Sequence, residues 1–128
     1  MNPLKDEDVL PLFAELDRKH YAGALTAAGY RVSLVQVAGL MEAVFACDED
    51  VAGWCLTSHR LILIDKDGDH QGGVRATLLH EMAHAKVDLD RPLSRRESPH
   101  GGRFWDEIGH LIGAGEECLG VILETSRP

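Results

Sequence analysis

The sequence contains no long hydrophobic run and no excess of basic residues. No apolar stretch approaches the roughly 20 residues that a membrane-spanning helix needs, so we expect no membrane association. Residues 1–8 are acidic and polar, unlike the apolar core of a secretory signal, and this favours a cytoplasmic location. The formal net charge of −8 disfavours unaided binding to a nucleic-acid backbone.

Paired cysteines are also lacking. The sequence has three cysteines, Cys47, Cys55 and Cys118, and no C-x-x-C pair. An odd number of cysteines without an export signal indicates reduced thiols that are buried as small hydrophobic side chains. The spacing of Cys47 and Cys55 is not one of the usual spacings of zinc ligands, so we do not expect a cysteine site there.

Nothing in the sequence divides the chain. It has no internal repeat, low-complexity tract or long linker, and 128 residues fit one domain better than two. We therefore predict a single domain over residues 1–128, with a core at about 8–113 and a short C-terminal tail at 114–128. The hydrophobic fraction of 45% and the charged fraction of 27% are typical of a folded globular chain.

The hydrophobic pattern predicts an α+β fold. Apolar residues at helical spacing predict an N-terminal helix at 8–21, a second helix at 74–87 and a further C-terminal helix at 103–112. Alternating or continuous apolar runs predict strands at 30–37, 41–47, 53–57 and 61–64. The expected architecture is a small antiparallel or mixed sheet of about three strands, with the helices covering one face.

The strongest chemical signal is H-E-x-x-H, formed by His80, Glu81 and His84 within the predicted helix at 74–87. Residues four apart lie on one helix face, so both imidazoles can bind a single ion. Zinc bound there would lower the pKa of its water to near 7 and polarise a carbonyl group. Glu81 is placed to act as the general base.

A catalytic zinc ion usually has three protein ligands, so a third residue is needed. His100 follows a loop at 85–99 that is long enough to return to the face carrying His80 and His84. Carboxylates from Glu107 or Glu116 are the alternatives. The other histidines have no matching spacing and are expected to be structural or solvent-exposed: His20, His59, His70 and His110.

The motif His80-Glu81-Met82-Ala83-His84-Ala85, followed by His100-Gly101-x-x-Phe104, resembles the SprT-like metalloprotease family, which includes the Spartan proteases. The resemblance continues upstream through Leu12-Phe13 with Tyr21, Gly53-Trp54-Cys55 and Leu61-Ile62-Leu63. It implies a zincin-like minimal metalloprotease core in which zinc is bound by His80, His84 and His100 and Glu81 is catalytic. It also implies that Gly101 bends the chain and that Phe104 packs beneath the turn at His100.

The segment from Arg91 to Arg103 differs in charge from the rest of the chain. It contains four arginines (Arg91, Arg95, Arg96, Arg103) and one acid, Glu97, so it carries +3 and the remainder −11. One interpretation is a solvated loop, and the other is an anion-contacting lip beside the active site.

These observations favour a zinc-dependent metalloendopeptidase acting on protein or peptide substrates. DNA-associated or crosslinked proteins are one substrate class that the resemblance implies, with DNA as a partner. Two alternatives remain open: a regulatory protease that cleaves one partner such as a repressor, and a zinc-stabilised binding module with little turnover. Glu81 argues against the binding module because a structural zinc site does not need a base.

Overall fold

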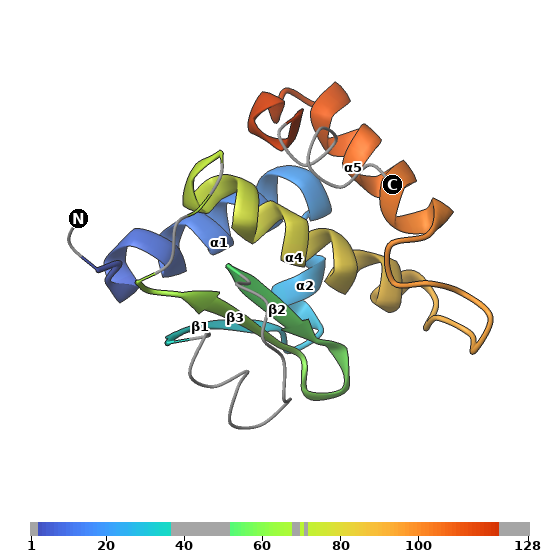
Figure 1. Ribbon diagram of the computed structural model, residues 1–128, viewed down its shortest axis with the longest axis horizontal. Helices are drawn as coiled ribbons and strands as arrows, with labels where there is room; N and C mark the ends of the chain where they lie inside the picture. The colour runs from blue at the N-terminus through green and yellow to red at the C-terminus, as the bar shows by residue number, and fades with distance from the viewer. Residues whose placement is uncertain (1–2, 37–51, 68–69, 71, 121–128) are drawn as a thin grey trace.

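A computed structural model describes residues 3–36, 52–67, 70 and 72–120 of the protein (Figure 1). The predicted strand at 41–47, which includes Cys47, lies outside these residues. The helices of the described part are α1 (Asp6–Tyr21), α2 (Ala24–Ala27), α4 (Gly73–Asp90) and α5 (Gly102–Gly113). With a three-stranded sheet, they confirm the α+β class. No helix in the described part of the chain has the length and hydropathy to cross a membrane.

The sheet is mixed and has the order β1-β3-β2. Strand β1 (Arg31–Val35) runs parallel to β3 (Leu61–Asp65), while β2 (Gly53–Leu56) runs antiparallel to it. The central strand is buried at four consecutive positions from Ile62 to Asp65, because it has a neighbour on each side and α4 packs over it. This burial explains why its apolar run is continuous rather than alternating.

Helix α4 is the centre of the fold. It contacts β2 and β3 as well as α1, α2 and α5, and in Figure 1 it crosses between the sheet and α5. Its buried side chains and those of its neighbours form one core that includes Leu16, Leu25, Ile62, Ile64, Leu78, Leu79, Met82, Phe104, Ile108, Leu111 and Leu119. Helix α4, which carries H-E-x-x-H, is therefore packed between the sheet and α5.

Helix α2 was not among the predicted helices. The carboxylate of Asp17 accounts for this short helix: it accepts hydrogen bonds from the backbone N–H groups of Leu25 and Thr26 at 3.1 and 2.9 Å. It also accepts a hydrogen bond from the Thr26 hydroxyl at 2.7 Å. Asp17 is 1% exposed, so these bonds satisfy a buried charge and fix the turn after α1.

Candidate metal centre

Two imidazoles project from the same face of α4. The ring centroids of His80 and His84 are 5.0 Å apart, as expected for residues one helical turn apart. Both side chains are partly buried. The geometry predicted from the H-E-x-x-H spacing is thus present.

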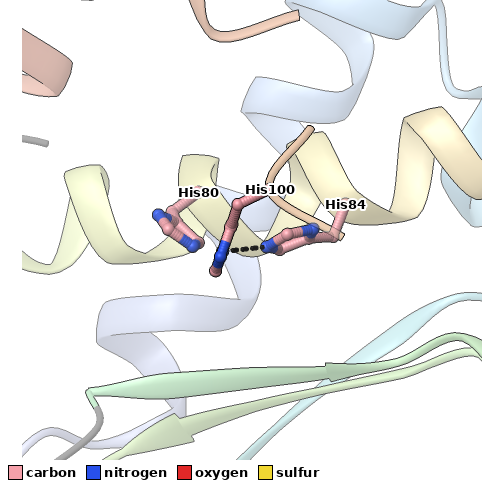
Figure 2. Close-up of side chains that lie close together, drawn as sticks. All are labelled: His80, His84 and His100. Atoms are coloured by element: carbon pink, nitrogen blue, oxygen red, sulfur yellow. Dashed lines mark hydrogen bonds between the residues drawn. The ribbon is translucent and has the colours of Figure 1, made fainter. Parts of the chain in front are cut away.

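The loop after α4 brings His100 to this pair (Figure 2). The Nε2 atoms of His84 and His100 lie 3.0 Å apart, and the His100 ring centroid lies 5.4 Å from that of His80. The turn depends on Gly101, where an added Cβ would lie 3.0 Å from the carbonyl oxygen of Ser98. Glycine therefore allows the tight approach that follows His100.

The three imidazoles have the spacing of a metal site. One ligand atom from each of His80, His84 and His100 lies within 4.8 Å of the other two. Nitrogens bound to one tetrahedral zinc at its usual bond length would be about 3.3 Å apart, so only small movements are needed. These three residues are close enough to bind one metal ion, and they are the one such group in the part of the chain described here.

Burial favours the neutral, metal-binding form of these rings. Burial, with a smaller contribution from the neighbouring imidazoles, lowers the pKa of His80 to about 4 and that of His84 to about 3. The pKa of His100 is also lowered by burial. Ligand nitrogens must be unprotonated to bind a metal, so the site is prepared for a cation at neutral pH.

Phe104 lies beneath all three rings. Its ring centroid is 5.0 Å from His80, 4.4 Å from His84 and 4.9 Å from His100. The side chain is 1% exposed and belongs to α5. The family resemblance implied packing beneath the turn at His100 alone; the contacts with the two helix histidines were not foreseen.

Glu81 lies on the sheet side of α4. It is buried, and a Cβ added at Gly53 of β2 would lie 3.2 Å from its Cγ. Burial raises the pKa of this carboxyl group to about 8. The thiol of Cys55 is near enough that the Glu81 charge raises its pKa, although burial is the larger cause.

The two carboxylates considered as alternative third ligands have other partners. Glu107 accepts a hydrogen bond from the Tyr21 hydroxyl at 3.0 Å. Glu116 is 3% exposed, forms ion pairs with Lys19 and Arg75 at 3.2 and 2.7 Å, and is hydrogen-bonded to His20 Nε2 at 2.6 Å. The structure therefore brings His100, and neither carboxylate, to the helix histidines.

The remaining histidines lie elsewhere. His20 belongs to the Glu116 network, and the ring nitrogens of His70 bond to the Thr77 hydroxyl and the Asp65 carbonyl at 2.8 Å each. His59 and His110 are exposed. None of the four joins the group at His80.

Comparison of the chain with known protein families, curated proteins and solved structures found no match.

Proposed function

We propose that this protein is a zinc-dependent metalloendopeptidase with a zincin-like core of the SprT-like type. The observation that carries the proposal is the convergence of His80, His84 and His100 on one point, with Glu81 next to the first of them in sequence. A site with three histidines and a remaining open position is typical of catalytic zinc, whereas structural zinc usually has four protein ligands.

Zinc bound at the histidines would polarise a substrate carbonyl and lower the pKa of water. Glu81 is the residue that accepts the proton and passes it to the leaving amine. Its burial raises its pKa to about 8, which favours the protonated state that the second half of this transfer requires. A cation at the adjacent histidines has the opposite effect and favours the carboxylate form that begins the cycle.

Three residues of the chain position this machinery. Phe104 supports the imidazoles from below, and Gly101 allows the turn that delivers His100. Gly53 leaves room for the Glu81 side chain between α4 and β2. We expect a substrate segment to bind in extended form beside α4, near β2. Residues 41–51 of the chain lie outside the described part.

The test measures the zinc content of the natural chain and of Glu81→Gln, and the cleavage of a disordered protein substrate by each. Glu7→Gln is the control, because Glu7 is an exposed acid on α1. We expect about one zinc ion per chain in all three proteins and cleavage by all but Glu81→Gln. If zinc binds but the natural chain cleaves nothing, with or without DNA, the protein is a zinc-stabilised binding module.

A further inference from the structure

The loop between α4 and α5 contains one acidic residue, Glu97, whose carboxylate is hydrogen-bonded to neighbouring residues. One carboxylate oxygen of Glu97 accepts hydrogen bonds from Arg91 Nη1 at 2.9 Å and from the Ser94 N–H at 3.2 Å, and the other accepts one from Arg103 at 3.2 Å. These partners, beginning with the Ser94 N–H, lower the pKa of Glu97 to about 2. The carboxylate of Glu97 therefore pairs with Arg91 and Arg103, and it does not neutralise Arg95 or Arg96.

Arg103 also fixes the loop against α4. Its Nη2 donates to the carbonyl oxygens of Val87 and Arg91 at 2.8 and 2.7 Å. Both acceptors lie at the C-terminal end of α4, where the Val87 carbonyl also accepts a hydrogen bond from the Arg91 N–H at 3.2 Å. The loop is thus held in one arrangement by its own side chains.

Arg95 and Arg96 belong to this loop but take no part in the contacts that hold it. Both are exposed, and neither forms a hydrogen bond or ion pair with any residue in 3–36, 52–67, 70 or 72–120. Arg96 lines a hollow of about 350 Å³ with Leu93, Ser98, Gly101, Gly102 and the paired side chains of Glu97 and Arg103. His100 follows Arg96 by four positions in the sequence, so their Cα atoms are within about 14 Å of one another.

We propose that Arg95, Arg96 and this hollow bind acidic side chains of the peptide substrate close to the bond that is cleaved. This inference rests on the proposed peptidase function and names the substrate class: chain segments rich in aspartate or glutamate. The planar guanidinium group of arginine can donate two hydrogen bonds to one carboxylate. Two unpaired guanidinium groups near the candidate metal site therefore favour peptides that carry an acidic side chain near the bond to be cleaved.

The charge distribution favours an acidic peptide over a nucleic acid. Outside the Arg91–Arg103 segment the chain carries −11, which repels an extended polyphosphate. Stable binding to a nucleic-acid backbone needs several phosphate contacts, whereas this surface offers two free arginines. An acidic side chain of a peptide needs only one or two such contacts.

The experiment measures binding separately from turnover. Zinc-loaded Glu81→Gln is titrated with a short labelled peptide that contains a run of glutamates, and with the same peptide carrying glutamines. The titrations are repeated with Arg95→Gln/Arg96→Gln and, as the control of equal charge, Arg18→Gln/Arg31→Gln, which removes two exposed arginines elsewhere. A single-stranded oligonucleotide is the competitor, and the two peptides are also compared as substrates of the natural chain.

We expect the glutamate peptide to bind roughly three- to tenfold more tightly than the glutamine peptide, since exposed ion pairs are individually weak. The preference should disappear in Arg95→Gln/Arg96→Gln, remain in the control and diminish with added salt. Equal binding of the two peptides, or a preference that survives loss of both arginines, overturns the proposal. So does tighter binding of the oligonucleotide through the same arginines, because the partner would then be a nucleic acid.

The two proposals fail separately. If the glutamate peptide binds through Arg95 and Arg96 but the natural chain cleaves neither peptide, the acidic-peptide surface stands and the peptidase function is wrong. If both peptides are cleaved and bound equally, the peptidase function stands and the surface is wrong.

Discussion

The ring of Phe104 stacks on the imidazole of His84, with centroids 4.4 Å apart and planes inclined by 20°. The same ring contacts His80 and His100 at more tilted angles. Because Phe104 is anchored in α5 and two of the histidines belong to α4, this contact couples the packing of the two helices to the arrangement of the metal-binding nitrogens. Loss of the Phe104 ring should therefore alter metal affinity as well as stability.

Phe104→Leu should weaken zinc binding about tenfold, since supporting residues around a metal site contribute at this level. Leucine keeps most of the buried apolar volume but not the flat ring on which His84 lies. Zinc affinity is measured by competition with a chelating dye. Leu111→Ala removes another buried α5 side chain and should lower stability by about 2–5 kcal/mol while leaving zinc affinity unchanged. Equal affinity in Phe104→Leu and the natural chain would contradict a supporting role for the ring.

Zinc should stabilise the folded chain through the three histidines. At free zinc a thousandfold above the dissociation constant, the expected gain in the free energy of unfolding is about 4 kcal/mol. Thermal unfolding with and without zinc measures it. His84→Ala should lose most of this gain, and His110→Ala, which removes an exposed histidine of α5, should keep it. An unchanged gain in His84→Ala would mean that zinc binds elsewhere.

Gly53→Ala should slow peptide cleavage without lowering zinc content. The added methyl would lie 3.2 Å from Glu81 Cγ, 3.1 Å from Thr77 Cγ2 and 3.0 Å from the Leu63 carbonyl oxygen. Displacing the base should reduce kcat roughly ten- to a hundredfold. Gly109→Ala is the matched control, because a Cβ there meets nothing within 4 Å.

A second substitution tests the crowding at Gly53 directly. Thr77→Ser removes Cγ2 but keeps the hydroxyl that bonds to His70. Combined with Gly53→Ala, it should restore part of kcat, while the contact with the Leu63 carbonyl remains. Failure of the double variant to recover any activity would show that the contacts with Glu81 and the Leu63 carbonyl, and not that with Thr77, account for the loss.

Acid should destabilise the fold through Glu116. Hydrogen bonding by Arg75, with contributions from His20 and Lys19, lowers the pKa of its carboxyl group from 4.5 to about 2. A folded-state pKa below the unfolded value means that ionised Glu116 stabilises the protein above about pH 5, and that this stabilisation is lost as the pH falls towards 2. The loss amounts to roughly 3 kcal/mol.

Denaturant unfolding between pH 6 and 2 measures this dependence. Glu116→Gln should be less stable at pH 6 and should show a flatter decline in acid. Glu117→Gln, which alters the exposed neighbouring acid, should follow the natural chain. A decline as steep in Glu116→Gln as in the natural chain would assign the acid sensitivity to other groups.

The predicted elements that fall within the described residues lie close to the observed ones because each depends on local pattern. The helix predicted at 74–87 extends over Gly73–Asp90, and the strand predicted at 61–64 over Leu61–Asp65. Helix α2 was missed because its cap comes from Asp17, a residue of the preceding helix that looked like an ordinary polar position. The parallel pairing of β1 with β3 was left open because strand direction depends on long-range topology, which periodicity does not report.

In the candidate site, too, local geometry could be predicted from the sequence and long-range packing could not. The position of His80 relative to His84 follows from helix geometry and could be read from spacing alone. The choice among His100, Glu107 and Glu116 required knowledge of where α5 packs, since all three follow the loop. Burial of Glu116 in an ion-pair network with α1 has no local signature, because its partners Lys19 and His20 are 97 and 96 residues away.

The closeness of the three candidate metal ligands along the chain has a consequence for how the protein folds. The three histidines fall within the segment 80–100, whereas the Glu116 network joins opposite ends of the polypeptide. The entropy lost on closing a loop grows with the logarithm of its length, so contacts between near neighbours form at lower cost. We expect a metal ion to bind the segment from α4 to α5 before the sheet is fully formed. Metal binding would then promote the folding of the chain in addition to serving the proposed activity.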